Sequence, residues 1–384
     1  MDAKRLPYLD SIRGIAAFTV LVHHCWLASI TVDGGLTFGL TSFPHFIHYF
    51  IGKFLAGRAA VLMFFVLSGF VLAHSLQKQP LSYASFTIKR LFRIYPVFVL
   101  VVISSYVLHK LIGIRYDGGN TFLSKEVIHS DLSTIALLKH LALWGTIQGK
   151  SLDVVIWSLV HEMRISLLFP VIMASVRKYR WRAVAFYWLL SLACTSTSLY
   201  LTGQVSLGYE ETTIVGSVFA TGYFIVFFAA GALLSIEREV VASTIRNLSR
   251  LKVFFLFVLV GLCLLKSGEN NTKAIFSDYI IGVGALGLIA LARAVQKFQT
   301  VLNHAIPVWL GRISYSLYLV HLPVLFVASQ MIGATWPRPL TSILVVALSL
   351  AIAELTARFI EFPAIMLGKR LVAVVSKPAA GTAR

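Results

Sequence analysis

Residues 59–77 read AAVLMFFVLSGFVLAHSLQ, an apolar run that carries no charged side chain. An α-helix rises about 1.5 Å per residue, so a run of this length extends roughly 28 Å. The hydrocarbon core of a bilayer is about 30 Å thick and needs a helix of about this length. The run is therefore typical of a membrane-spanning helix, and the question is how many others the chain contains.

The composition of the whole chain agrees with a membrane protein. Of its 384 residues, 58% are hydrophobic and only 13% are charged, whereas a soluble domain carries about 25% charged residues. No segment shows the strict alternation of an outer-membrane strand, and unpaired backbone groups are costly in lipid, so helices are expected. Ten apolar runs qualify as spans: 11–31, 59–77, 94–113, 154–175, 182–202, 214–235, 251–267, 274–293, 312–334 and 340–362. We predict an all-α polytopic membrane protein with about ten transmembrane helices in one bundle over residues 1–371, followed by a disordered cytoplasmic tail over residues 372–384.

Lysine and arginine alternate between the two sides of the predicted membrane. The N-terminus, the even-numbered loops and the tail hold 22 of these residues, and the odd-numbered loops hold 10. Because cytoplasmic loops carry the excess of Lys and Arg, both termini are expected to be cytoplasmic, in the inner membrane. The long connections 32–58 and 114–153 are then external. Topology and contact with anionic lipids explain most of the net charge of +18, so no nucleic acid is expected as a partner.

The first predicted span carries ionisable groups at unusual depth. Arg13 and His24 are eleven residues apart, which places them about 20° from each other around a helix and about 16 Å apart along it. Asp10 precedes Arg13 by three residues and can pair with it. A mid-membrane imidazole often marks a pathway or a reaction centre, although a rim arginine and a hydrogen-bonded core histidine would also fit. We interpret His24 as functional and His23, which points about 80° away from the Arg13 face, as a packing residue.

Six motifs in order carry a family resemblance: LDSIRGIAAFTVLVHH, FFVLSGF, KRLFRIYPVF, WSLVHE, GRISYSLYLVHLPV and FIEFPAIMLGKRL. Together they cover nearly the whole chain, and they resemble the acyltransferase-3 family of integral membrane acyltransferases. The resemblance implies a ten-helix bundle that moves an acyl group, expected to be acetyl, from cytoplasmic acyl-CoA to a hydroxyl of a cell-envelope or exported glycan. Because longer family members carry an extra exported domain that this chain lacks, direct transfer onto a lipid-linked sugar or surface glycan is expected.

The family motifs assign candidate site residues. The Arg-x10-His motif falls on Arg13 and His24, the Arg-x-x-Arg motif falls on Arg90 and Arg93, and the acidic residue of the Trp-Ser-Leu motif is Glu162. The resemblance thus makes His24, Glu162 and Arg13 the candidate catalytic residues. Acyl-CoA is the expected donor substrate, with no bound cofactor.

The residue chemistry of the two arginines supports a donor site independently of the family. Arg90 and Arg93 are three residues apart at the cytoplasmic start of the third span, so they share one helix face. Two guanidinium groups suit bidentate capture of phosphate, and coenzyme A carries a diphosphate and a 3′-phosphate. We expect Arg90, Arg93 and Arg13 to bind these phosphates, although an ordinary positive-inside anchor would also explain the two arginines. No metal site is expected, because the cysteines are isolated and lack ligand spacing.

Further ionisable residues are expected near the same cavity. Glu162 lies about 12 Å from the outer boundary, at a depth similar to that of His24, where a carboxylate could orient or stabilise a base. Here the chain departs from the commoner family pattern, because His161 and Arg164 flank Glu162; His161 could share the role of His24, and Glu162 could be a structural partner of Arg164. The other expected cavity residues are His321, which could instead be a satisfied core histidine, and Asp10 and Trp157.

Two acidic residues outside the family motifs are expected to be structural. Glu354 and Arg358, four residues apart in the last span, are predicted to form an ion pair. Asp278, at the outer end of the eighth span, is predicted to be solvated.

The mechanism predicted from these residues is general-base catalysis by His24 on an acceptor hydroxyl that arrives from the outer side, aided by Glu162. Direct transfer and a covalent acyl-histidine both stay open. The expected partners are acyl-CoA, a glycan or lipid-linked sugar acceptor and membrane lipids. The alternative is a proton-coupled transporter or flippase of a polysaccharide precursor, because buried His and Glu also suit a carrier. No duplicated pair of helices broken by Gly or Pro supports that alternative.

Overall fold

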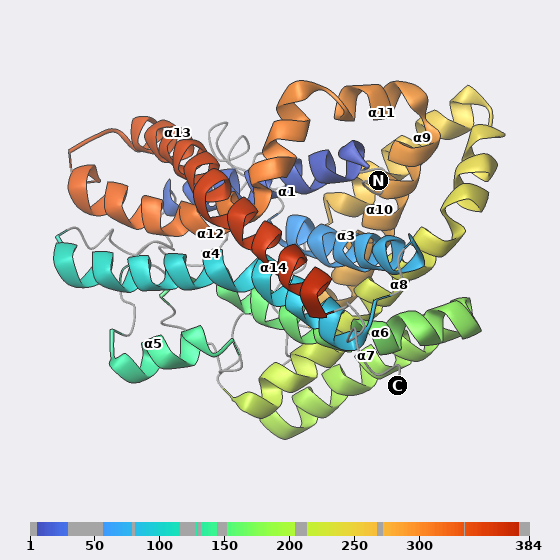
Figure 1. The fold of residues 1–384 in the computed structure, drawn as a ribbon. Coiled ribbons are helices and arrows are strands. Elements are labelled where there is room, and N and C mark those ends of the chain that lie inside the picture. The colour runs from blue at the N-terminus through green and yellow to red at the C-terminus, as the bar shows by residue number, and fades with distance from the viewer. Residues whose placement is uncertain are drawn as a thin grey trace, which may run out of the picture.

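The computed structural model of the protein describes residues 6–29, 57–78, 81–115, 128, 132–143, 152–203, 213–266, 272–333 and 335–375. Every regular element within these ranges is a helix, and they contain no β-strand (Figure 1). The prediction of an all-α polytopic membrane protein is confirmed. Residues 32–56 of the predicted external connection 32–58 lie outside the described residues, as do residues 376–384 of the predicted tail.

The helix labels below are those of Figure 1. The bounds are α1 Pro7–Ser29, α3 Gly57–Lys78, α4 Tyr83–Ile112, α5 Thr134–Leu141, α6 Ile156–Tyr179, α7 Trp181–Thr202, α8 Ile214–Arg246, α9 Arg250–Leu264, α10 Thr272–Ala294, α11 Gln296–Leu302, α12 Ala305–Ile332, α13 Arg338–Thr356, a π-helical turn Ala357–Glu361 and α14 Phe362–Val375. Side-chain hydroxyls begin several of them: Ser82, Ser133, Thr213 and Ser249 each accept a hydrogen bond from a backbone N–H in the first turn of α4, α5, α8 and α9.

Nine helical stretches in the described residues are long and apolar enough to cross a membrane, and the last of them joins α13, the π-helical turn and α14. The remaining predicted span, 251–267, corresponds to α9. This helix has only 15 residues and would extend about 22 Å, so it is shorter than a standard span.

The direction of α12 indicates that α9 nevertheless crosses the bundle. Gly14 of α1 lies against Gly311 of α12, and His24 of α1 bonds to His321 of α12. The histidine contact lies ten residues after the glycine contact in both helices, so α1 and α12 run parallel. Parallel directions require an odd number of crossings between them. That number is seven (α3, α4, α6, α7, α8, α9 and α10) only if α9 is included.

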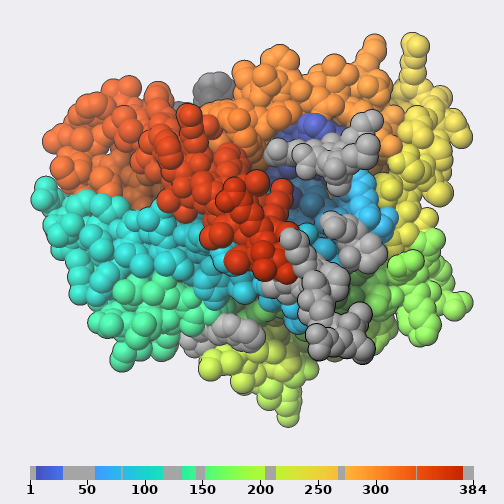
Figure 2. Space-filling model, in the orientation of Figure 1, coloured from blue at the N-terminus to red at the C-terminus, as the bar shows by residue number. Residues whose placement is uncertain are grey.

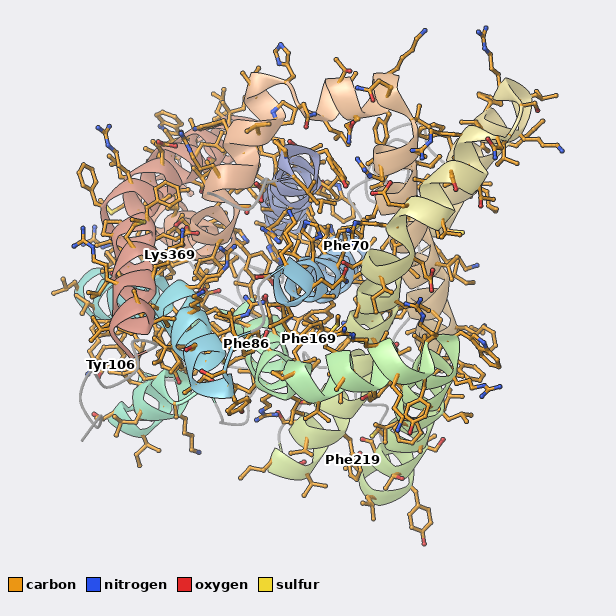
Figure 3. The ribbon with its side chains drawn as sticks, turned by 45° about the vertical axis from the view of Figure 1, so that its right-hand side comes forward. Phe70, Phe86, Tyr106, Phe169, Phe219 and Lys369 are labelled. Carbon is orange, nitrogen blue, oxygen red and sulfur yellow. The ribbon has the colours of Figure 1, made fainter. Side chains whose placement is uncertain are left out.

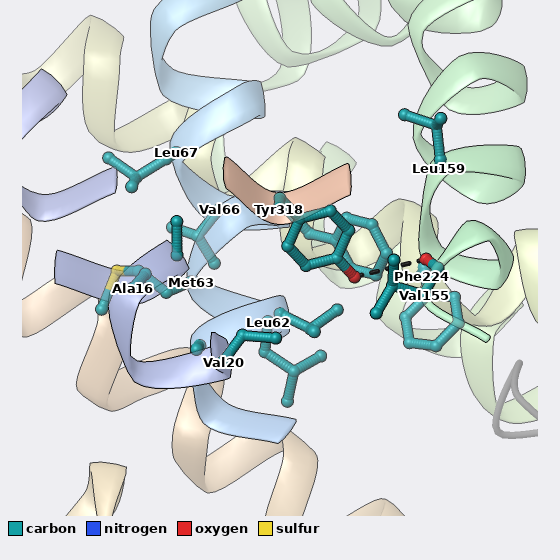
Figure 4. Packing of buried hydrophobic residues seen from close by; sticks show 14 of the residues in the cluster. Ala16, Val20, Leu62, Met63, Val66, Leu67, Val155, Leu159, Phe224 and Tyr318 are labelled. Atoms are coloured by element: carbon teal, nitrogen blue, oxygen red, sulfur yellow. Dashed lines mark hydrogen bonds between the residues drawn. The ribbon is translucent and has the colours of Figure 1, made fainter. Parts of the chain in front are cut away.

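The core of the bundle lies around α12, α3 and α8, which are the most buried spans. Figure 4 shows how Ala16 and Val20 of α1 and Leu62 of α3 pack there, with Phe224 of α8 and Tyr318 of α12 in the same cluster. By contrast, α7 and α9 expose large apolar side chains on much of their surface. A helix that exposes apolar side chains in this way suits contact with lipid, because lipid tails are themselves apolar.

Candidate active site

Two histidines from opposite ends of the sequence form the centre of the candidate site. His24 of α1 and His321 of α12 are joined by a hydrogen bond of 2.9 Å between Nδ1 of His24 and Nε2 of His321. The two rings are nearly parallel, with centroids 5.1 Å apart. His321 is buried and His24 is partly buried. The structure therefore brings together two of the histidines that were expected in the cavity.

The hydrogen bonds around this pair assign the tautomers of the neutral rings. Nδ1 of His321 lies 3.1 Å from the carbonyl oxygen of Leu317, which can only accept, so this nitrogen carries the proton. In a neutral ring Nε2 of His321 is then an acceptor, and Nδ1 of His24 must donate to it. It follows that Nε2 of His24 holds a lone pair and is the basic atom of the pair.

A close backbone contact sets the register of the two helices that carry the histidines. A Cβ atom added to Gly14 would clash with the backbone of Gly311, and one added to Gly311 would clash with the backbone of Asp10. Only glycine allows the helices to approach this closely. Because the contact lies ten residues before each histidine, it positions the two imidazoles opposite each other.

A charged cluster lies toward the N-terminal end of α1 from the histidine pair. Arg13 forms an ion pair of 3.5 Å with Asp10 and lies within electrostatic reach of Arg93, Glu162 and Glu361. Arg90 lies within reach of Glu162, Arg93 and Arg13. The three arginines expected to bind the donor thus belong to one cluster, contributed by α1 and α4.

Arg90 is exceptional within this cluster because it is buried and one of its N–H donors has no partner among the described residues. Its side chain is only 9% exposed, and among the described residues its Nε–H has no hydrogen-bond acceptor. A buried charged donor without a partner is costly, and such a group in a native structure calls for a physical explanation. A bound anion would supply the missing acceptor.

Glu162 belongs to the charged cluster as well. Its Oε1 accepts a hydrogen bond of 3.0 Å from Ser68 of α3, and its nearest charges include Arg90 and Arg13. The His24 ring, by contrast, is hydrogen-bonded to His321.

Glu361 is a member of the cluster that the sequence did not single out. It ends the π-helical turn Ala357–Glu361, is 3% exposed, and accepts a hydrogen bond of 2.7 Å from Ser316 of α12. Arg93 and Arg13 are its nearest cationic groups. π-helical turns often occur at functional sites, and its place in the motif FIEFPAIMLGKRL is the one signal that could have drawn attention to it.

His161 and Arg164 face α8. Nδ1 of His161 lies 2.9 Å from Oγ1 of Thr221, and the guanidinium of Arg164 donates to the hydroxyl of Ser217 at 2.8 Å and to that of Thr221 at 3.1 Å. Because the Thr221 hydroxyl itself donates to the Ser217 carbonyl, it accepts from both side chains. These described contacts give both residues a structural role between α6 and α8.

Trp157 lies beneath an ion pair between α3 and α10. The guanidinium of Arg58 is 5.3 Å from the Trp157 ring and 2.6 Å from the carboxylate of Asp278. Tyr223 donates a further hydrogen bond of 2.8 Å to Asp278, which is 2% exposed. The prediction that Asp278 is solvated is therefore wrong, because α3 and α8 bring it an arginine and a tyrosine.

His23 lies on a different face of α1 from His24. Its ring lies against Gly57 of α3 and 5.9 Å from the ring of Trp26. His23 and His24 therefore point in different directions from α1, as the helical periodicity predicted.

A narrow cavity lies beside Leu322 and Pro323, the two residues that follow His321 in α12. It is lined by Ser105, His109, Leu152, Asp153, Val154, Leu322 and Pro323, and it is too narrow to admit a water molecule. Burial raises the pKa of the Asp153 carboxyl well above its usual range, and a hydrogen bond from the backbone N–H of Val155 only partly opposes this. Within the described ranges no group of three or more His, Cys, Asp or Glu residues could hold a metal ion.

The sequence matches the family Acyl_transf_3, described as an acyltransferase domain, over residues 6–358. The chain belongs to this acyltransferase family. Family membership favours acyl transfer over the carrier that the buried His and Glu residues would also have suited. The charged cluster and the histidine pair both lie in the matched region, apart from Glu361.

The relatives of this acyltransferase chain carry related names. A "Putative O-acetyltransferase" of Staphylococcus aureus strain COL is 25% identical over 391 residues, which cover 93% of this chain and 57% of that protein. The O-acetyltransferase OatA of S. aureus strain MRSA252 is 24% identical and covers 99% of this chain and 60% of its own length. OatA of strain NCTC 8325 is likewise 24% identical, with 97% and 59% covered. The chain thus spans less than two thirds of the length of these relatives, and no solved structure matches it.

Proposed function

We propose that this acyltransferase moves an acetyl or similar acyl group from acyl-CoA to a hydroxyl of an envelope glycan or lipid-linked sugar. The donor binds from the cytoplasmic side of the inner membrane, where both termini also lie. The name O-acetyltransferase, which relatives over most of this chain carry, supports acetyl as the group and a hydroxyl oxygen as the acceptor. The excess of Lys and Arg on one side supports the orientation.

The observation that carries this proposal is the hydrogen bond between His24 and His321. His321 fixes the His24 ring with its Nδ1 protonated, which leaves Nε2 as a base of defined direction. Nε2 takes the proton of the acceptor hydroxyl while the oxygen attacks the thioester carbonyl. The tetrahedral intermediate then releases the thiolate of coenzyme A, which recovers the proton from His24. One C–S bond breaks, one C–O bond forms, and no proton is left over.

The charged cluster supplies the donor site in this proposal. Arg13, Arg90 and Arg93 carry three positive charges, and buried Arg90 has an unsatisfied donor, as expected of a site that binds an anion. Arg13 and His24 are about 16 Å apart along α1, a separation that the extended pantetheine arm would bridge. Figure 2 shows that the surface is hollowed between α14, α12 and α3, with α1 visible in the hollow. Such a hollow would let a donor reach the cluster.

The two buried glutamates have a role on the donor side of the site. Glu162 and Glu361 lie among the arginines, where they offset part of the positive charge and hold the guanidinium groups apart. His321 takes the orienting role that the sequence assigned to Glu162. Direct transfer is proposed, because this geometry explains His24 as a base without a covalent intermediate.

The proposal is tested by acetyl-CoA turnover in nanodiscs. Purified protein should release coenzyme A from acetyl-CoA, and release should increase when a suitable glycan acceptor is added. His24→Ala should reduce the rate by about 10²- to 10⁴-fold, the usual loss for a general base, while the protein remains monodisperse. His23→Ala is the matched control, since it removes the neighbouring imidazole from another face of α1. Full turnover in the His24 variant would overturn the proposal.

A further inference from the structure

Three buried hydrogen-bonding groups on α4 and α6 have no partner among the described residues. They are Oγ1 of Thr87, Nε of Arg90 and Oγ of Ser166, and none of them meets an acceptor or donor in the part of the chain that the structure describes. Ser166 is 0% exposed and Arg90 is 9% exposed. Leaving such groups unsatisfied is unfavourable, so three of them on neighbouring helices indicate a site for a ligand with several acceptor atoms.

Helix geometry puts Thr87 and Ser166 at one level, about one helical turn from Arg90. Arg90 on α4 lies within electrostatic reach of Glu162 on α6, and these two successive spans run antiparallel. Thr87 comes three residues before Arg90 and Ser166 comes four residues after Glu162, so each shares a face with its reference residue. In antiparallel helices both steps lead in the same direction, toward the cytoplasmic side of the Arg90–Glu162 level.

Neighbouring aromatic residues agree with this placement. Phe86 precedes Thr87 on α4, and Phe169 lies three residues after Ser166 on α6. The two rings are buried, their helices are in contact, and they lie near each other in Figure 3. Buried apolar side chains thus occur next to these polar groups along both helices, and a charge-assisted hydrogen bond in apolar surroundings is stronger than in water.

We propose that Thr87 and Ser166, together with Arg90, bind a phosphate group of the acyl-CoA donor. This inference rests on the proposed function and adds two residues to its donor site. The Nε–H of Arg90 and the two hydroxyls donate to phosphate oxygens, which satisfies all three groups at once. Glu162 lies one turn further toward the outer side, so its carboxylate repels the phosphate and limits how deeply it enters. The uncharged pantetheine arm is the part of the donor that continues to His24.

The test compares coenzyme A and pantetheine binding by calorimetry to the full chain in nanodiscs. Thr87→Val and Ser166→Ala remove the hydroxyls with little change of shape, and each should weaken coenzyme A binding about 10-fold, as expected for a lost hydrogen bond to a charged group. Pantetheine, which lacks the phosphates, should bind as it does to the unmodified protein. Ser349→Ala is the matched control, because Ser349 on α13 is also buried with an unsatisfied hydroxyl; its affinity for coenzyme A should not change.

Thermal stability gives a second readout that a merely structural role would not produce. Because neither hydroxyl has a hydrogen bond to lose, Thr87→Val and Ser166→Ala should keep or raise the melting temperature without ligand. The upward shift that coenzyme A causes should shrink in both, since it depends on affinity.

Two results would count against the inference. Unchanged coenzyme A affinity in both variants overturns it, and equal weakening for pantetheine overturns the assignment to phosphate. Arg93→Ala separates this failure from that of the proposed function. If Arg93→Ala weakens coenzyme A binding while the hydroxyl variants do not, only the inference fails. If Arg93→Ala also has no effect, the whole donor site is wrong.

Discussion

Gly14 and Gly311 lie backbone to backbone where α1 meets α12. Ten residues further along both helices, His24 and His321 are joined by their hydrogen bond. Neither glycine touches the imidazoles, yet the separation of the two backbones at this point decides whether the rings can meet. A contact at one level of the bundle thus determines the chemistry at another.

Gly311→Ala should separate α1 from α12 and misalign the histidines. The added methyl group meets backbone atoms of Asp10, which cannot move as a flexible side chain would, so we expect a loss of about 1–3 kcal/mol in stability. A misplacement of about 1 Å at a catalytic group can cost roughly 10²-fold in rate. Turnover and melting temperature should therefore both fall. Gly261→Ala on α9, where the methyl group would enter open space, should change neither; unchanged turnover in Gly311→Ala would show that the register is not required.

Replacement of His321 separates orientation from packing. In His321→Gln, an amide oxygen can still accept the proton of His24 Nδ1, so turnover should stay within about 10-fold of normal. His321→Leu fills a similar volume but has no acceptor, and the wrong tautomer of His24 should then cost roughly 10²-fold or more. Rates are measured at saturating acetyl-CoA, with the melting temperature as a check on folding. Equal activity of the two variants would remove His321 from the mechanism.

A matched test concerns His161. Its described contacts tie α6 to α8, so His161→Ala should lower the melting temperature more than the turnover of folded protein. If His161 were the base instead, this variant would be inactive and His24→Ala only slowed.

The arginine pair should discriminate between guanidinium and ammonium groups. Arg90→Ala and Arg93→Ala should each weaken acyl-CoA binding by about 10-fold or more, since charge-assisted hydrogen bonds to phosphate are lost. Lysine at either position should restore binding only in part, because it keeps the charge but not the fork of donors. Binding is measured by displacement of a labelled acyl-CoA. Normal affinity in both alanine variants would leave these arginines as topological anchors.

Cysteine labelling tests the orientation. After Cys25, Cys194 and Cys263 are replaced, single cysteines at Lys125 and Lys377 should react with an impermeant maleimide from opposite sides of the membrane. The former should be labelled in intact spheroplasts and the latter only after permeabilisation. This outcome follows from the 22 to 10 distribution of Lys and Arg and from ten crossings. Labelling of both from one side would contradict ten crossings.

Asp153 should make stability depend on pH in an unusual direction. Burial raises the pKa of this carboxyl in the folded protein, so the folded state binds its proton more tightly than the unfolded state does. The stability linked to this proton is present below the ordinary pKa and is lost as the pH rises through the raised value. Asp153→Asn, which cannot ionise, should therefore be more stable than the unmodified protein at neutral pH, with the difference vanishing near about pH 4. Melting temperatures across this range check the prediction, and a constant difference would contradict it.

Apolar runs predicted the number and position of the crossing helices well, because a bilayer imposes the same length on every span. They could not predict how the spans pack laterally. The sequence predicted that His24 and His321 lie near one cavity. It did not predict that α1 packs beside α12 rather than beside another helix. The same limit explains Asp278, whose partner Arg58 lies 220 residues away.

Local spacing misled the prediction for Glu354. At four residues from Arg358 it suited a helical ion pair, but the structure gives it Arg312 at 3.2 Å and the Trp309 indole at 2.8 Å, both on α12. Arg358 belongs to the π-helical turn that follows α13, and its guanidinium lies over the Phe359 ring instead. This prediction is wrong because contacts between helices outweighed contacts within one. Glu361 was missed for the same reason, since its meaning depends on arginines from α1 and α4.

The parallel contact between α1 and α12 also has a consequence for synthesis. The two imidazoles are separated by 297 residues, and a ribosome adds roughly 5–20 residues per second. The first helix therefore waits about 15–60 s for the partner that sets the tautomer of its histidine. Arg13 is already in the nascent chain when the interval begins, and Arg90 and Arg93 follow His24 by 66 and 69 residues. In the proposed mechanism, acyl transfer can begin only after the ninth crossing has been inserted and has docked against the first.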